Sequence, residues 1–207
     1  MIHTSWLGRV PYGPTLAAQR EYRGRVAAGE APEALWLLEH DPVITTGRRV
    51  VQDLPPAEVL SAAGYDLHVT ERGGLATCHE PGQLVGYLFV DARSIGVRRL
   101  VEAIEEGLIH WLRAQGAAAG RREGYPGVWV AAEKLAAIGI HVGRGVSMHG
   151  FALNLVNDRR GFSLITPCGI HDGGVGSVRS VLGTAPTPEE AAQSVGAAVV
   201  AAVEAAR

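Results

Sequence analysis

The apolar residues of segment 97–115 recur at the spacing of an α-helix. Leu100, Ile104 and Leu108 are four residues apart, and polar or charged residues lie between them. This spacing places the apolar side chains on one face of a helix, and Gly116 follows as a stop. We therefore expect an amphipathic helix over residues 97–115 with one face in the core.

Two further helices have recognisable start signals. Pro14 suits a first helical turn and is followed by scattered apolar residues up to a glycine, which predicts a helix over residues 14–29. The run Thr187-Pro188-Glu189-Glu190 is a capping box with proline at the first helical position. It predicts the start of an alanine-rich C-terminal helix. A short helix is expected at residues 57–63.

Short runs rich in apolar, β-branched and aromatic residues predict strands. They cover residues 34–39, 43–46, 65–70, 83–90, 127–130, 136–142 and 147–156, with a turn expected at residues 133–134. Strands outnumber helices and many are joined by short turns. This favours an α+β fold with a mixed, largely antiparallel sheet flanked by helices. A length of 207 residues fits a single domain over residues 1–207.

Composition and charge exclude several classes of protein. With 47% hydrophobic residues and a net charge of −2, the chain is neither disordered nor a nucleic-acid-coating protein. No stretch approaches the eighteen or so apolar residues that span a membrane, and the N-terminus does not resemble a signal peptide. We expect a cytoplasmic protein with no nucleic-acid or membrane partner. Its two cysteines are then expected to be free thiols.

The segment 72–83 has the features of a binding loop. It places three glycines together with Arg72 and His79 between two expected strands, where the backbone can approach a ligand closely. The alternative is an ordinary long hairpin turn. A metal site is not expected, because Cys78 and His79 are adjacent in sequence and no Cys-x-x-Cys or His-Glu-x-x-His spacing occurs.

Three other residues have chemistry that invites a role. Cys168 lies between a proline and a glycine that leaves space for an incoming group, although a buried, inert thiol is the alternative. Lys134 is the only lysine among 19 basic residues, and lysine, unlike arginine, can lose its proton. A compositional bias toward arginine explains the same count. His149 lies in an alternating strand and faces either a pocket or the sheet interior.

Several motifs give the chain a resemblance to a known family over almost its whole length. They are Glu39-His40-Asp41-Pro42-Val43-Ile44-Thr45-Thr46-Gly47-Arg48, Arg72-Gly73-Gly74-x-x-Thr77-x-His79-x-Pro81-Gly82-Gln83, Tyr125-Pro126-Gly127-Val128-Trp129-Val130, Lys134-x-x-x-Ile138-Gly139, His149-Gly150-Phe151-Ala152-x-Asn154 and Pro167-Cys168-Gly169-Ile170. With them the chain resembles the lipoyl(octanoyl) transferases of lipoate biosynthesis. It departs from the family pattern at Gly176-Ser177, where Thr-Ser is expected.

The resemblance implies a fold shared with biotin and lipoate protein ligases, and roles for individual residues. Cys168 matches the nucleophile that forms a thioester, and Lys134 matches its partner lysine. The implied acyl-pocket residues are Arg72, Gly73, Gly74, Leu75, Ala76, Thr77, Cys78, His79, Ala137, Ile138, Gly139, Gly150, Phe151 and Ala152, to which the alternating pattern adds His149.

The implied activity moves an octanoyl or lipoyl group from acyl carrier protein to a lysine of a lipoyl domain. The acceptors would be lipoyl domains of 2-oxoacid dehydrogenase complexes and the H protein of glycine cleavage. No metal, nucleotide or other cofactor is expected, because a thioester donor is already activated. The alternatives are an ATP-dependent lipoate or biotin ligase, a thioester hydrolase, and a non-catalytic acyl-binding module.

Overall fold

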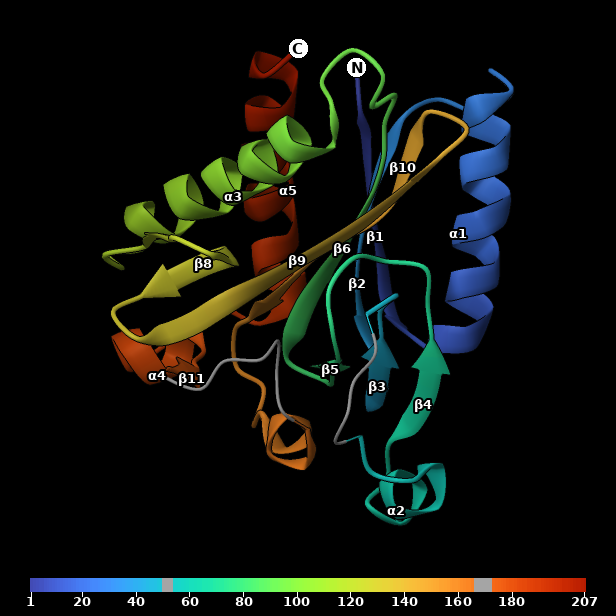
Figure 1. The fold of residues 1–207 in the computed structure, drawn as a ribbon. Coiled ribbons are helices and arrows are strands. Elements are labelled where there is room, and N and C mark those ends of the chain that lie inside the picture. The colour runs from blue at the N-terminus through green and yellow to red at the C-terminus, as the bar shows by residue number, and fades with distance from the viewer. Residues whose placement is uncertain (50–53, 166–172) are drawn as a thin grey trace.

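The computed structural model describes residues 1–49, 54–165 and 173–207 (Figure 1). Its helices are α1 (Tyr12–Ala27), α2 (Ala57–Ala62), α3 (Val97–Ala114), α4 (Val178–Leu182) and α5 (Pro188–Ala205), with a 3₁₀ helix, η1, at Arg160–Leu164. Its strands are β1 (His3–Val10), β2 (Ala34–His40), β3 (Val43–Thr46), β4 (Asp66–Val69), β5 (Thr77–His79), β6 (Gln83–Phe89), β7 (Gly120–Arg122), β8 (Tyr125–Val130), β9 (Glu133–Gly143), β10 (Val146–Asn154) and β11 (Gly174–Val175).

The described strands form two sheets. The larger sheet has the order β1-β2-β6-β10-β9-β8-β7, and β11 pairs with β9 outside this path. Its pairs are antiparallel except for β1 with β2 and β11 with β9. The smaller sheet has the order β4-β3-β5, with β3 parallel to β4 and antiparallel to β5. The predicted α+β fold with a mixed, largely antiparallel sheet is confirmed.

Helices cover both faces of the larger sheet. Helix α1 lies on one side, and α3 and α5 lie together on the other (Figure 1). Strand β2 shows why both faces are buried, because its side chains alternate between two apolar clusters. Leu35 and Leu37 pack in the cluster that contains α3 and α5, whereas Ala34 and Leu38 pack with α1.

The strongest helix predictions are confirmed. Helix α3 has the expected bounds to within a residue and buries its apolar face, and α5 begins with the expected capping box. There the Thr187 backbone N–H donates to Glu190 Oε2 at 2.8 Å, which satisfies a donor that the first helical turn leaves free. Among the described residues, no helix combines the length and apolarity needed to cross a lipid bilayer.

The structure corrects three local predictions. The expected turn at residues 133–134 is wrong, because Lys134 lies inside β9 and the chain reverses at residues 131–132, where Ala131 has a φ of 50°. The expected loop at 72–83 contains strand β5, which pairs with β3. Strand β1 was not expected; it is an edge strand with mostly exposed or partly exposed side chains, so it lacks a strong apolar pattern.

Candidate active site

A cavity that opens to solvent lies on the α1 face of the larger sheet, with about 500 Å³ of empty space when the open solvent at its mouth is included. Its floor comes from three neighbouring strands, because side chains two residues apart point to the same face. The floor consists of two rows of paired residues, Val85–Ala152–Ala137 and Tyr87–Gly150–Gly139.

The segment 72–75 forms the roof of the cavity. The Arg72 guanidinium donates to the backbone oxygen of Thr45 at 2.7 Å and to the Thr45 hydroxyl at 3.0 Å, so its position is fixed by β3. The Gly73 N–H donates to the Ile140 oxygen of β9 at 3.1 Å. The roof is therefore tied both to the small sheet and to the strand that supplies part of the floor.

The cavity brings together most of the residues that the sequence motifs suggest. Thirteen of the fifteen expected pocket residues line it: Arg72, Gly73, Gly74, Leu75, Thr77, His79, Ala137, Ile138, Gly139, His149, Gly150, Phe151 and Ala152. Tyr12, Val85 and Tyr87 line it as well and were not singled out as pocket residues. The period-two pattern of segment 83–90 is the signal that predicts Val85 and Tyr87 on one face.

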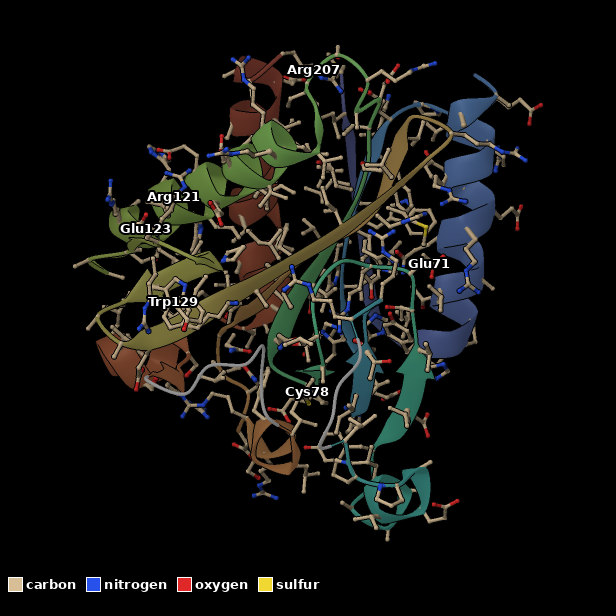
Figure 2. The ribbon with its side chains drawn as sticks, viewed as in Figure 1. Glu71, Cys78, Arg121, Glu123, Trp129 and Arg207 are labelled. Atoms are coloured by element: carbon tan, nitrogen blue, oxygen red, sulfur yellow. The ribbon has the colours of Figure 1, made fainter. Side chains whose placement is uncertain are left out.

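Ala76 and Cys78 do not line the cavity. They alternate with Thr77 and His79, so they point away and pack with Ile44 in a separate apolar cluster. Cys78 is fully buried, and burial raises the pKa of its thiol well above the ordinary value. In Figure 2, Cys78 lies low in the view beside β5. Cys78 is therefore an inert thiol that packs as a small apolar side chain. Cys168 lies outside the described residues.

Lys134 lies on β9, three residues before Ala137. Only 7% of the residue is exposed, and its Nζ lies 5.6 Å from the centre of the Trp129 ring. A Cβ atom on Gly127 would lie 2.5 Å from Lys134 Cε and 3.2 Å from its Nζ, and it would collide with the Ala136 oxygen. The amine of Lys134 therefore lies near the Ala136 backbone, and Ala136 precedes the cavity residue Ala137, although Lys134 itself does not line the cavity.

Glu105 of α3 fixes the glycine on which Lys134 packs. Its carboxylate accepts from the Gly127 N–H at 2.8 Å and from Arg121 Nε at 2.8 Å. The Glu105 side chain is 7% exposed, so the arginine supplies the partner that a buried carboxylate requires. In Figure 2, Arg121 lies beside α3, on the same side of the view as Trp129. Glu105 was not predicted, because a glutamate on an amphipathic helix is typical of its solvated face.

Strand β11 joins the segment after Cys168 to the Lys134 strand. Gly174 pairs with Glu133 and Val175 pairs with Lys134, and the Gly176 N–H donates to the Lys134 oxygen at 3.0 Å. Position 176 is the departure from the family pattern. A Cβ atom there would collide with the Glu133 carboxylate, so glycine fits the space that Glu133 occupies.

The histidines of the cavity are buried and electrically neutral near pH 7. Burial lowers the pKa of His79 to about 3 and that of His149 to about 4. His79 Nδ1 donates to Gln83 Oε1 at 2.7 Å, because the Gln83 amide nitrogen is itself a donor to the Asn154 side chain. By contrast, the bond from Arg20 holds the pKa of the Glu71 carboxyl at about 2.

The described part of the chain contains no group of side chains suited to bind a metal ion. No three side chains of histidine, cysteine, aspartate or glutamate are grouped there as metal ligands would be. What the cavity offers is an apolar floor and a glycine-rich roof. The Lys134 amine is not part of its lining but lies near Ala136, next to the lining residue Ala137. This arrangement suits a ligand with a flexible apolar chain and a reactive group near Lys134.

Comparisons with known proteins agree with this geometry. The model for the lipoyl protein ligase A/B catalytic domain matches residues 11–200. The octanoyltransferase of Alkaliphilus metalliredigens is 45% identical over 86% of this chain and 84% of its own length. That of Mycolicibacterium gilvum is 40% identical over 98% of this chain and 86% of its own.

Known structures share the fold at much lower identity. A lipoate-protein ligase A bound with ATP has a TM-score of 0.74 at 15% identity, covering 99% of this chain and 85% of its own. The biotin protein ligase of Aquifex aeolicus has a TM-score of 0.57 at 10% identity, covering 99% of this chain and 70% of its own. From the family model and the identities of 40% and above, the chain belongs to the lipoyl protein ligase A/B catalytic domain family and, within it, to the octanoyltransferases.

Proposed function

We propose that the chain transfers an octanoyl group from acyl carrier protein to a lysine of a lipoyl domain, in lipoate biosynthesis. Cys168 is the nucleophile and Lys134 its proton-exchanging partner. The observation that carries this proposal is the cavity itself. It has an apolar floor and a glycine-rich roof, and the buried Lys134 amine lies near Ala136, beside the cavity residue Ala137; an acyl chain that ends in a thioester fits this arrangement.

The first half-reaction forms an acyl-enzyme. The thiolate of Cys168 attacks the thioester carbonyl, the bond from the carbonyl carbon to the carrier thiol breaks, and that thiol leaves after taking a proton. Lys134, as an ammonium, favours the thiolate and supplies a proton near the leaving group. The β11 pairing supports this partnership, because residues 174–175, shortly after Cys168 in sequence, pair with residues 133–134.

The second half-reaction transfers the acyl group to the acceptor. The lysine amine of the lipoyl domain attacks the carbonyl carbon of the acyl-enzyme, an amide bond forms, and the thiolate of Cys168 leaves. The attacking nitrogen must lose a proton, and a neutral Lys134 takes it. An arginine has no comparable neutral form, which explains a lysine at this position.

The remaining assignments follow from this reaction. The acyl-binding residues are 72–75, 77, 79, 137–139 and 149–152, and they belong to one catalytic domain over residues 1–207. The partners are octanoyl-acyl carrier protein, lipoyl domains of 2-oxoacid dehydrogenase complexes and the glycine cleavage H protein, in the cytoplasm. A fold neighbour from Thermoplasma acidophilum is a bipartite lipoate protein ligase described with its E2 lipoyl domain, which supports a lipoyl domain as the acceptor.

Intact-mass spectrometry tests the covalent step. After incubation with octanoyl-acyl carrier protein, we expect the chain to gain the mass of one octanoyl group, and Cys168→Ala to gain none. Cys78→Ala is the matched control, because it removes the other thiol, which is buried away from the cavity, and it should keep the adduct. An adduct that persists in Cys168→Ala would overturn the assignment.

The same reaction separates the proposal from an ATP-dependent ligase. Transfer from octanoyl-acyl carrier protein to a lipoyl domain should proceed without ATP, because the thioester supplies the activation. Activity that requires free octanoate and ATP would instead indicate a ligase. Release of octanoate to water without amide formation would indicate a hydrolase.

A further inference from the structure

Strand β9 supplies three consecutive residues to the cavity lining. The Lys134 amine lies near the Ala136 backbone, and Ala137, Ile138 and Gly139 line the cavity in order. The next residue, Ile140, pairs with His149 of β10. A strand rises about 3.3 Å per residue, so His149 stands about 10 Å beyond Ala137. Trp129 and Glu71, which neighbour Lys134 and His149, lie toward opposite ends of β9 in Figure 2.

This length matches an eight-carbon chain. Seven carbon–carbon bonds of about 1.5 Å span roughly 9 Å when the chain is extended in staggered rotamers. A chain whose carbonyl carbon lies beside the Lys134 amine therefore ends near the row of Gly139 and Gly150. The terminal methyl group would then stop just before His149.

The backbone closes the cavity at the same row. Gly73 is bonded to the Ile140 oxygen, and a Cβ atom on Gly139 would lie 3.1 Å from the Gly73 oxygen and 3.3 Å from Arg72 Cδ. The roof and the floor are therefore in close contact there. The floor is sheet backbone and the roof is bonded to it, so side chains complete this end: Tyr87 in the same row and His149 beyond it.

His149 is a fixed polar obstacle. Its side chain is 3% exposed, and its φ of 60° is unusual for a residue with a Cβ atom. Its backbone N–H donates to Gln19 Oε1 at 3.2 Å. Within the described residues its Nε2 has no hydrogen-bond partner. The nearest carboxylate oxygen, on Glu71, is 3.8 Å away and is held by Arg20. A methylene group pressed against this nitrogen would keep it unpaired, which costs free energy.

From this geometry we infer that His149 sets the length of the acyl chain at about eight carbons. A longer chain must displace a packed imidazole or bury its extra methylene groups against an unpaired nitrogen. His149 is thus a specificity-determining residue at the far end of the cavity. The inference rests on the proposed octanoyl transfer and adds the basis of its chain-length preference.

A series of acyl donors tests this inference. We would measure kcat/KM for transfer of hexanoyl, octanoyl, decanoyl and dodecanoyl groups from acyl carrier protein to a lipoyl domain. His149→Gly removes the side chain and accepts the positive φ, so it should fold. We expect its decanoyl-to-octanoyl ratio to rise about 10-fold or more, which is the size of such effects in apolar pockets. His149→Asn, which also tolerates this φ, should give a smaller rise.

The control is His141→Ala, on the neighbouring strand and outside the cavity lining, which should keep the wild-type ratio. An unchanged ratio in folded His149→Gly would overturn the inference while leaving octanoyl transfer intact. If the wild-type protein transfers no acyl group of any length, the proposed function itself is wrong. The two failures are therefore distinguishable.

Discussion

The two ends of the cavity hold opposite kinds of polar group. At one end Lys134 packs against an aromatic ring and a glycine, with the Glu105–Arg121 ion pair behind them. At the other end His79 and His149 are buried, and their lowered pKa values leave both imidazoles neutral near pH 7. The comparison shows that burial alone does not decide charge. The Glu105 carboxylate is buried beside a charged partner, Arg121, whereas at His149 burial outweighs the nearby Glu71 carboxylate and leaves the imidazole neutral.

The largest effect should come from the reactive end. Lys134→Arg keeps the positive charge but removes the readily lost proton, so we expect transfer to fall at least about 100-fold. Rapid-quench measurements should show that the acyl-enzyme still forms while its transfer to the lipoyl domain stalls. Near-normal turnover would limit Lys134 to an electrostatic role. The proposed difference between a proton-exchanging amine at one end and neutral imidazoles at the other would then be wrong.

A smaller but still large loss is expected from Gly127→Ala. The new methyl group would collide with the Ala136 oxygen and the Lys134 side chain, and the φ of 132° is poorly suited to alanine. Turnover should fall about 10-fold or more, with a loss of stability of about 2 kcal/mol. Gly120→Ala is a matched control on β7, because a Cβ atom there meets nothing within 4 Å. Equal behaviour of the two variants would contradict the packing argument.

Glu105→Ala should lower kcat several-fold with little change in KM. The effect is indirect. The variant removes the acceptor of the Gly127 N–H, so the glycine on which Lys134 packs is no longer held in place. Arg121→Ala, which leaves the Gly127 bond in place, separates this positioning effect from the loss of an ion pair. The pH dependence of turnover should shift in Glu105→Ala and not in Arg121→Ala if Glu105 acts through Lys134.

The smallest effect on turnover is expected from the histidine end, where pH changes stability instead. A histidine with a lowered pKa stabilises the fold fully above its unfolded value of about 6.5, and this contribution is lost as the pH falls toward its folded value. Between pH 7.5 and 5.5 we expect each of His79 and His149 to lower the free energy of unfolding by about 1 kcal/mol.

Urea unfolding at the two pH values measures this loss. His149→Asn should reduce the pH dependence by about 1 kcal/mol, and Lys134→Arg should leave it unchanged. Glu71 does not contribute in this window, because its pKa is lowered to about 2 and its share of stability is lost only below about pH 4.5. An unchanged pH dependence in His149→Asn would show that His149 is not held neutral by burial.

Local patterns predicted the elements that position the site. The apolar spacing of α3, the capping box of α5 and the alternation of β6 and β10 each reflect which face is buried, and burial leaves a periodic trace in the sequence. The motifs brought together residues from three separate segments that the structure places around one cavity. Long-range order of this kind was accessible only through the family resemblance.

The remaining features depend on contacts that leave no local trace. Lys134 follows a polar residue and was expected in a turn, although β9 begins one residue earlier and pairs on both sides. Glu105 is buried because Gly127 and Arg121 meet it across a strand pair, which no helical pattern reveals. Ala76 and Cys78 were grouped with their neighbours, and the β5 pleat sends them to the opposite side.

The pairing of β9 with β10 also limits how this enzyme can be redesigned or can evolve. Inserting or deleting one residue between Ala137 and Ile140 would move every later side chain of β9 to the opposite face, so the cavity cannot be lengthened in single-residue steps. Substitution at the end of the cavity changes its depth without changing the strand register. New acyl specificities in this family should therefore arise from point substitutions around position 149, and alignments of β9 should be free of gaps.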